Sequence, residues 1–173
     1  MILCPYCDAE NIEGADVCEQ CQLSLADLSL RAPASEAERG LLRDRIETLN
    51  PKKPLSVGPD VPIGDVLRTM INSGIGCMTV VEGDRLLGIF SERDALMRVN
   101  VDAAKLAARP VSEVMTVNPA TLRSRDKIAF ALQRMNVGGF RHIPILDADD
   151  RLVGVISIRD ILRYLTERHA ARS

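Results

Sequence analysis

The twelve residues RLLGIFSERDAL at positions 85–96 return as RLVGVISIRDIL at positions 151–162, with seven of the twelve positions identical. The two blocks are 66 positions apart in the sequence, whereas the matching residues upstream of them, such as Cys77 and His142, are 65 positions apart. The turn between the two halves is therefore one residue longer in the second copy. Self-similarity at a fixed period indicates two copies of one structural unit.

Each copy predicts the same order of elements. An amphipathic helix follows a short extended segment, and a glycine break then leads into an apolar strand, a turn, a second strand and a helix that begins near the shared serine. The predicted first helices cover residues 63–72 and 127–136, and the predicted apolar strands after them cover residues 77–81 and 142–146. The repeat therefore predicts two β-α-β-β-α units, a mixed α/β (α+β) fold.

Two further segments, VSEVMTVNPATL at 111–122 and FRHIPILD at 140–147, complete the pattern. Together with the shared blocks they resemble a tandem pair of cystathionine β-synthase (CBS) domains, often called a Bateman module, over about residues 55–168. The resemblance implies two CBS repeats in a pseudo-twofold arrangement. We place the first repeat at residues 55–110 and the second at residues 111–173.

The serine and the aspartate of the shared block have two physical interpretations. Ser and Asp three residues apart form a capping box, in which both side chains satisfy free N–H groups at a helix start. Both copies also have an arginine in the first helical turn, Arg93 and Arg159, where a cation opposes the helix dipole. Such an arginine indicates either a nearby anion or a local ion pair with a neighbouring acid, which would contribute little.

The resemblance to CBS domains implies a site for an adenosine nucleotide, AMP, ADP or ATP, between the repeats. In that family the aspartate binds the ribose hydroxyls, the serine helps to hold phosphate, and the adjacent strand holds adenine. The chemistry agrees, because a carboxylate only accepts hydrogen bonds and a helix N-terminus favours phosphate. Carried over by position, the candidate nucleotide-binding residues are Met78, Ser91, Arg93, Asp94, Arg141, His142, Ile143, Ser157, Arg159 and Asp160.

The two copies differ where the first apolar strand begins. The first has Gly76-Cys77 where the second has Arg141-His142, so the first supplies no cation there. Successive strand residues face opposite ways, so Arg141 and His142 cannot both point into one pocket unless the strand begins after them. A packed or solvated His142 is as consistent with the sequence as a ligand contact. We therefore expect at most one strong nucleotide site, built mainly from the second copy.

Four of the five cysteines form two CxxC pairs near the N-terminus, separated by ten residues: Cys4, Cys7, Cys18 and Cys21. Two CxxC turns bring four thiolates together, as a tetrahedral zinc ion requires. The alternatives are two disulfides, disfavoured in a chain that is not secreted, or a redox motif, which needs one CxxC beside a βαβ pattern. Residues 1–26 resemble a short zinc ribbon, so structural zinc is the expected metal.

The ribbon differs from its family in two ways. Ribbon knuckles often have glycine after the second cysteine, whereas this chain has Asp8 and Gln22; glutamine tolerates the left-handed backbone less well, which puts the second knuckle in question. Residues 1–26 also contain five acids and no lysine or arginine. Because phosphate contacts need cations, we expect this ribbon to dock a protein partner or cap the fold, and not to bind nucleic acid.

Residues 27–54 are expected to be a helical linker. Ser35 and Glu38 can form a capping box, and apolar residues recur at helical spacing from Leu41 to Leu49. A helix of roughly 14 residues is predicted, ending before the prolines at 51 and 54.

Composition limits the function classes. The 173 residues have a net charge of -2, five aromatic side chains and two histidines, and no apolar run long enough for a membrane span. The chain shows no GxSxG, HExxH or P-loop motif. We therefore expect a cytoplasmic protein that is not an enzyme. The charge divides as -5 for residues 1–26, +1 for 27–54, -1 for 55–110 and +3 for 111–173, which sums to -2.

Three hypotheses follow from these features. The leading one is a non-catalytic sensor of an adenosine nucleotide, homodimeric through apolar helix faces such as Ile161, Leu162 and Leu165, which signals through the zinc ribbon to an unidentified protein. A second is a scaffold that dimerises through ligand-free CBS repeats. A third is a nucleic-acid-associated regulator acting through the ribbon, which the acidic charge of that segment disfavours.

Overall fold

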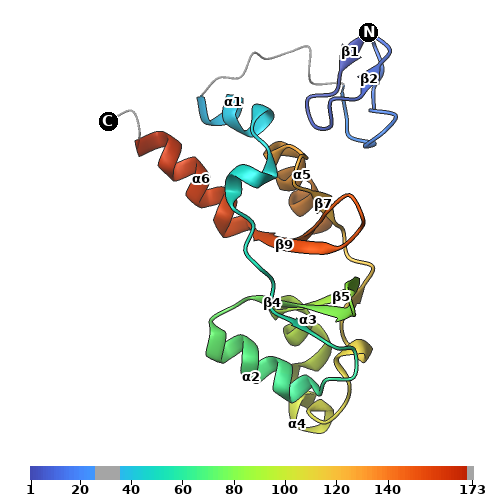
Figure 1. Ribbon diagram of the computed structural model, residues 1–173, viewed down its shortest axis with the longest axis vertical. Coiled ribbons are helices and arrows are strands. Elements are labelled where there is room, and N and C mark those ends of the chain that lie inside the picture. The colour runs from blue at the N-terminus through green and yellow to red at the C-terminus, as the bar shows by residue number, and fades with distance from the viewer. Residues whose placement is uncertain (26–35, 171–173) are drawn as a thin grey trace. The chain divides into compact units, whose positions relative to one another are not determined.

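The computed structural model describes residues 1–25 and 36–170 (Figure 1). The chain forms two compact units, which we call the ribbon unit (Met1–Asn50, Leu122–Arg141 and Ile156–Ser173) and the sheet unit (Pro51–Thr121 and His142–Val155). Both predicted β-α-β-β-α copies are present, and the mixed α/β fold class is confirmed. Within the described ranges no helix is long and apolar enough to cross a membrane.

A four-stranded sheet organises the first copy within the sheet unit. Its order is β3 (Ser56–Val57), β4 (Cys77–Glu82), β5 (Arg85–Ser91) and β6 (Thr116–Val117). Strand β3 runs parallel to β4, whereas β5 is antiparallel to both of its neighbours. Helix α2 (Ile63–Ser73) lies beside this sheet (Figure 1). Both α2 and β4 extend one residue beyond their predicted ends.

The core of the sheet unit lies between α2 and the sheet. Helix α2 buries Ile63, Val66 and Met70, spaced three and four residues apart, against Phe90 and other strand residues. Burying a side chain of this size contributes roughly 1.5 to 3 kcal/mol. Three residues that precede β7 (Leu122–Arg123) in sequence join this core: Val111, Val114 and Met115. The segment that opens the second copy in sequence therefore packs on the first.

Both copies begin a helix directly after the shared serine, as predicted, but the two helices differ. In the first copy α3 (Glu92–Asp94) widens into the π-helical turn η2 (Ala95–Val99), which ends at Asn100 with a φ of 42°. The short elements η3 (Asn100–Asp102), α4 (Ala103–Leu106) and η4 (Val111–Glu113) follow. In the second copy α6 (Ile158–Ala170) is a regular helix of 13 residues. The second copy therefore supplies the longer helix dipole.

The second copy contains β7 (Leu122–Arg123), α5 (Ile128–Gly138), β8 (His142–Leu146) and β9 (Leu152–Ser157) before α6. Strands β8 and β9 are hydrogen-bonded neighbours. The predicted glycine break is present in both copies, because α2 ends at Gly74 (φ 61°) and α5 at Gly139 (φ 62°). A left-handed glycine at this position is a common way to end a helix.

The linker is not the single helix of roughly 14 residues that its apolar spacing predicts. Helix α1 (Glu36–Arg43) has eight residues and is followed by the 3-10 helix η1 (Ile46–Leu49). The break falls at Asp44 and Arg45, whose main chains pair with residues far along the chain: the Ile128 N–H donates to the Asp44 carbonyl, and Arg45 bridges Lys127. Tertiary hydrogen bonds thus replace helical ones. The predicted cap at Ser35 lies outside the described residues.

Asp44 connects α1 to α6 within the ribbon unit. Its carboxylate accepts hydrogen bonds from the Tyr164 hydroxyl (2.8 Å), from Arg43 Nε (3.0 Å) and from Arg168. Gly40 permits this approach, because a Cβ at that position would clash with the Tyr164 hydroxyl. Burial by itself raises the pKa of Asp44, but these hydrogen bonds and the charge of Arg168 outweigh it and hold the pKa below its ordinary value of 3.8.

Replacing Asp44 with alanine should lower the free energy of unfolding by about 1 to 3 kcal/mol, because the Tyr164 hydroxyl loses its acceptor and Arg168 its counter-charge. The loss should be full above pH 4 and should shrink as the pH falls through the depressed pKa of Asp44, where the wild type also loses the ionised form. Urea unfolding at several pH values measures both effects. Asp102→Ala, which removes the exposed pair with Lys105, is the control and should cost less than about 0.5 kcal/mol.

Candidate functional site

The shared motif of the second copy sits where β9 leads into α6. Asp160 is buried, and its Oδ2 accepts hydrogen bonds from the Ser157 N–H and from Ser157 Oγ, both at 2.7 Å. Its Oδ1 accepts from Arg163, whose side chain is 52% exposed. The Ile158 N–H donates to the Arg141 carbonyl at 2.9 Å, which fixes Arg141 beside the start of the helix.

Two cations in this region of the ribbon unit have no side-chain partner among the described residues. Arg141 and Arg159 are exposed, and within the described part of the chain neither side chain forms an ion pair or a hydrogen bond. Arg159 lies in the first turn of α6, where a cation opposes the helix dipole. The sequence allowed two interpretations of this arginine, a nearby anion or a local ion pair. Among the described residues, Arg159 forms no such ion pair.

The motif of the first copy is satisfied internally. Ser91 and Asp94 form a complete capping box: the Ser91 N–H and Oγ donate to Asp94 Oδ2 at 2.9 and 2.6 Å, and the Asp94 N–H donates back to Ser91 Oγ. The other oxygen, Oδ1, accepts from Thr116 Oγ1 at 2.8 Å and lies 3.7 Å from Arg98. The capping interpretation is thus confirmed for the first copy, where neighbours surround both carboxylate oxygens.

The difference between the two aspartates can be traced to single positions. In the first copy Gly88 pairs with Val117. The equivalent glycine of the second copy, Gly154, lies against residues 51 and 52. In the register, Ile89 pairs with Thr116, and the equivalent Val155 forms a bridge with Lys52. Thr116 is therefore matched by Lys52, which has no hydroxyl to donate. The Glu92 N–H donates to the Gly76 carbonyl at 3.0 Å, so Gly76 occupies the place of Arg141.

The remaining predicted residues are placed as follows. His142 is the first residue of β8 and lies against Gly76: a Cβ on Gly76 would be 2.9 Å from His142 Cε1 and 3.3 Å from Glu92 Cδ. Met78 and Ile143 are buried, so an adenine could meet their main chain more readily than their side chains. Arg93 is exposed in the first turn after Ser91. The assignment of these residues to a nucleotide stays a prediction.

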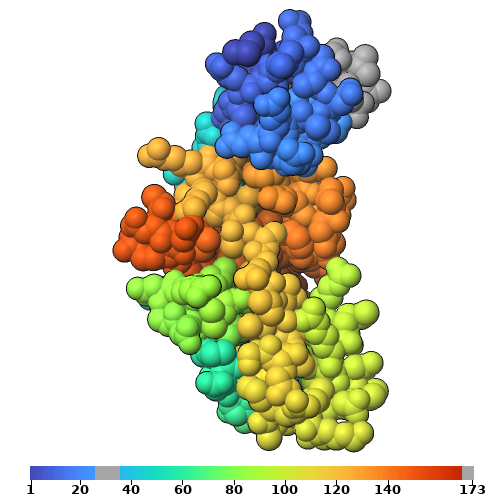
Figure 2. Space-filling model, turned by 90° about the vertical axis from the view of Figure 1, so that its right-hand side faces the viewer, coloured from blue at the N-terminus to red at the C-terminus, as the bar shows by residue number. Residues whose placement is uncertain are grey.

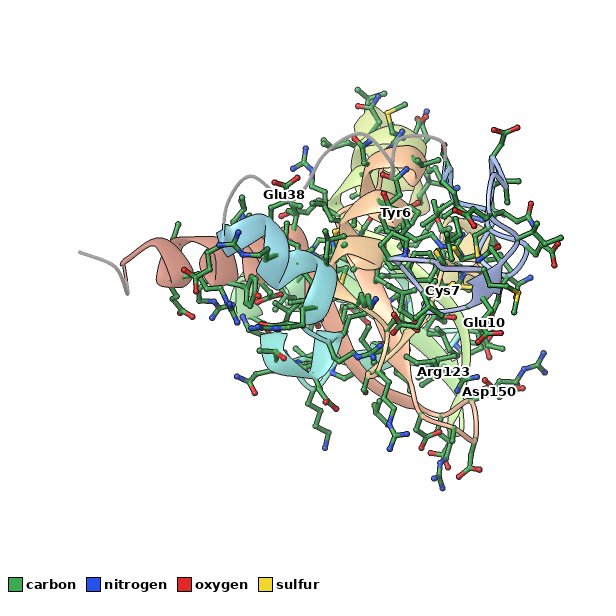
Figure 3. All side chains as sticks on the ribbon, turned by 90° about the horizontal axis from the view of Figure 1, so that it is seen from above. Tyr6, Cys7, Glu10, Glu38, Arg123 and Asp150 are labelled. Atoms are coloured by element: carbon green, nitrogen blue, oxygen red, sulfur yellow. The ribbon has the colours of Figure 1, made fainter. Side chains whose placement is uncertain are left out.

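The four N-terminal cysteines form one cluster. All four Sγ atoms lie within 4.8 Å of one another, and sulfur atoms gather near the labelled Cys7 in Figure 3. The Sγ–Sγ distances are 3.7 Å for Cys4 and Cys21 and 3.6 Å for Cys7 and Cys18. Zn–S bonds of about 2.3 Å in a tetrahedron give sulfur–sulfur edges of about 3.8 Å. The cluster therefore fits a tetrahedral thiolate-bound metal.

The two CxxC knuckles have the same backbone. The Asp8 N–H donates to the Cys4 carbonyl and the Gln22 N–H to the Cys18 carbonyl, each at 2.9 Å. Asp8 has a φ of 62° and Gln22 a φ of 59°, the left-handed region that glycine usually supplies. Glutamine therefore does adopt the conformation that the sequence put in question. Strands β1 (Ile2–Leu3) and β2 (Glu10–Asn11) pair antiparallel beside the knuckles.

Asn11 is a second-sphere residue that sequence reasoning missed. It is buried, its Nδ2 donates to Cys18 Sγ at 3.5 Å, and its Oδ1 accepts from the Glu19 N–H at 3.0 Å. Burial raises the pKa of the Cys18 thiol, but the N–H groups of Cys21 and Gln20 and the Asn11 amide outweigh it and lower the pKa to about 6. These donors favour the thiolate of Cys18, the form that binds metal, whereas burial raises the pKa of the Cys7 and Cys21 thiols.

Comparison with known proteins identifies the repeat. The family model for the CBS domain matches residues 46–100 and again residues 111–167. The chain belongs to the CBS-domain family. Neither match includes the cysteine segment. The domain boundaries, with the first repeat at residues 55–110 and the second at residues 111–173, stay a prediction.

Several CBS-domain relatives are similar over about 70% of this chain. An uncharacterised 17.7 kDa protein of Acidianus ambivalens is 29% identical over 126 residues, which cover 72% of this chain and 75% of the relative. An inosine-5'-monophosphate dehydrogenase of Methanocaldococcus jannaschii is 31% identical over 122 residues, 70% of this chain but 23% of that enzyme. The similarity thus spans most of one relative and less than a quarter of the other.

Solved structures show the same CBS-pair fold. A CBS-domain-containing protein of Agrobacterium tumefaciens has a TM-score of 0.65 and 31% identity, covering 69% of this chain and 98% of that one. A CBS-domain protein of Pyrobaculum aerophilum, solved in complex with AMP, has a TM-score of 0.62 and 25% identity, covering 72% of this chain and 99% of that one. CBS pairs of this architecture therefore include one that binds AMP.

Proposed function

We propose that this CBS-domain protein is a non-catalytic regulatory protein that binds an adenosine nucleotide of the AMP, ADP or ATP class at the start of α6. The observation that carries the proposal is a pair of exposed arginines beside Ser157 and Asp160: the side chains of Arg141 and Arg159 have no partner among the residues that the structure describes. The positive end of the α6 dipole and these cations would favour a phosphate. The AMP complex of the Pyrobaculum aerophilum protein supports this choice of ligand.

The ribose would bind the carboxylate of Asp160. Asp160 Oδ1 accepts a hydrogen bond from Arg163, whose side chain is exposed. Rotation of that side chain into solvent would free Oδ1 for a ribose hydroxyl. In the first copy the corresponding oxygen is bonded to Thr116. We therefore assign the strong site to the second copy and a capping role to Asp94.

The cysteine cluster would hold a structural zinc ion. Cys4, Cys7, Cys18 and Cys21 supply four thiolates at tetrahedral spacing, and zinc would crosslink a segment whose own core is small. Exposed apolar residues on this segment, Leu3, Ile12 and Val17, offer a surface for an unidentified protein partner. We infer homodimerisation from Leu162, the exposed member of the expected face, and from the exposed Leu96 and Met97 of the first copy, and sedimentation velocity would detect it. Ile161, which was expected on that face, is buried within its own chain and is not part of it.

Calorimetric titration tests the proposed function. AMP, ADP and ATP are titrated into the full chain. Adenosine, which lacks the phosphate, and inorganic phosphate, which lacks the nucleoside, serve as control ligands. At least one nucleotide should give saturable heat and bind more tightly than either control ligand. Absence of binding by all three nucleotides would support the ligand-free CBS scaffold instead.

Replacing Arg159 with glutamine should weaken the binding of the preferred nucleotide by roughly 3- to 30-fold, because one charged hydrogen bond to phosphate is lost from a partly solvated site. Adenosine, which has no phosphate, should bind the variant as it binds the wild type. Arg93→Gln makes the same change in the first copy and should leave the nucleotide affinity unaltered. Equal losses for both variants would contradict the assignment to the second copy.

A further inference from the structure

A buried lysine marks the contact between the cysteine segment and the second copy. Lys127, the N-cap residue of α5, is 8% exposed, and its ammonium donates to the Asp8 carboxylate. Within residues 1–25 and 36–170, Asp8 is the carboxylate that pairs with it. Lysine is almost never buried to this extent without a partner. Asp8 therefore compensates a charge that belongs to the second copy.

The surface that receives Asp8 is rigid. Arg45 donates to Asp8 Oδ2 at 3.0 Å and, through its other terminal nitrogen, to the Arg125 carbonyl at 2.8 Å. Arg45 also forms a β-bridge with Lys127. The Ile46 N–H donates to the Asp126 carbonyl at 2.9 Å, and the Glu47 N–H to the Ser124 carbonyl at 3.0 Å. These main-chain bonds hold the two cations of the receiving surface in fixed positions.

The position of Asp8 depends on the first cysteine knuckle. Its N–H donates to the Cys4 carbonyl, and its left-handed φ of 62° sets the direction of its side chain. The corresponding residue of the second knuckle, Gln22, has no charge and is exposed. The closed Cys4-to-Cys7 turn thus places the carboxylate within reach of Lys127 and Arg45.

Charge complementarity extends beyond this one carboxylate. Asp8 lines a cavity of about 480 Å³ together with Leu42 and four cations: Arg39, Arg43, Arg45 and Lys127. Arg45 and Lys127 pair with Asp8, and Arg43 pairs with Asp44. The cysteine segment itself has five acids and no lysine or arginine in residues 1–26. In Figure 2 the blue surface of this segment lies against the orange surface that includes α5. An acidic module therefore rests on a basic surface of its own chain.

We propose that the cysteine segment is a metal-dependent clasp on its own second CBS repeat. Metal bound by the four thiolates closes the first knuckle and places the Asp8 carboxylate in contact with Lys127 and Arg45. Loss of the metal opens the knuckle and exposes both cations, Lys127 at the start of α5 and Arg45 before η1. The clasp rests on the proposed metal site and goes beyond it, because it gives that site a docking surface within the same chain.

Hydrogen exchange on the zinc-loaded full chain tests the clasp. Asp8→Asn removes the charge but keeps a residue that tolerates the left-handed backbone, so the knuckle should still close. We expect the variant to retain one zinc per chain, while amide exchange in residues 124–128 rises roughly tenfold, because a buried charge has lost its partner. Asp16→Asn alters another exposed acid of the same segment and should leave the exchange unchanged.

Chelation gives the second arm of the experiment. Zinc removal from the wild type should raise exchange in residues 124–128 by the same factor, and it should add nothing in Asp8→Asn. Lys127→Met, which keeps the apolar stem without the charge, should abolish the effect of Asp8→Asn. Unchanged exchange in Asp8→Asn, or additive effects of chelation and Asp8→Asn, would overturn the clasp. A wild type that takes up no zinc would instead contradict the metal site, and the Asp8 and Lys127 variants would still measure the contact.

Discussion

A chain in which Cys18 is replaced by serine should lose its zinc, and residues 1–25 should unfold while the CBS pair stays folded. Zinc binding by four thiolates contributes on the order of 10 kcal/mol of folding free energy in small zinc modules. The cysteine segment has little else: its buried apolar residues are Cys4, Cys18 and Leu25. The core of the sheet unit shares none of these residues.

The measurements are zinc content and residue-resolved amide spectra. Wild type should contain one zinc per chain, and Cys18→Ser should contain less than about a tenth of that, since the tetrahedral site keeps three of its four ligands. Amide signals of residues 1–25 should collapse to random-coil positions, and the thermal transition of the CBS pair should remain. Cys77→Ser, a buried cysteine of the first copy, is the control and should keep its full zinc content. Retention of zinc by Cys18→Ser would refute the metal site.

The parts of the fold that could be predicted are those that local sequence determines. The repeated block predicted both copies, and the amphipathic pattern of residues 63–72 placed α2 to within one residue. The CxxC spacing predicted the cysteine cluster, because two tight knuckles of that length bring four sulfurs together. In each case the residues that interact lie within one motif.

The features that sequence reasoning missed depend on contacts between distant segments. Thr116 reaches Asp94 because β6 pairs with β5, across 22 residues. Sequence alone indicated only that Lys127 begins a predicted helix and belongs to the +3 charge of residues 111–173, and its burial depends on Asp8, 119 residues away. Asn11 stands in a polar stretch where no spacing distinguishes it from its neighbours. The linker helix was predicted too long because hydrogen bonds of Asp44 and Arg45 to the second copy replace helical ones.

The second large effect expected is on nucleotide binding. Asp160→Asn should weaken the preferred nucleotide by roughly 10- to 100-fold, because a neutral amide replaces a carboxylate that accepts from hydroxyl groups, and one charged hydrogen bond is worth about 1.5 to 3 kcal/mol. Adenosine should lose affinity by a similar factor, since it has the same ribose. Inorganic phosphate should be unaffected. Calorimetric titration of the three ligands therefore separates recognition of the ribose by Asp160 from recognition of phosphate by Arg159.

Asp94→Asn separates this loss from damage to the helix cap. Both aspartates accept from the N–H and the Oγ of the serine three residues earlier, so both substitutions disturb the same capping contacts and should cost similar stability, about 1 kcal/mol. Thermal unfolding checks that equivalence. If Asp160 binds ribose and Asp94 acts as a cap, Asp160→Asn alone should lose nucleotide affinity. Equal losses in both variants would instead require two equivalent sites, in conflict with the Thr116 hydrogen bond that occupies Asp94 Oδ1.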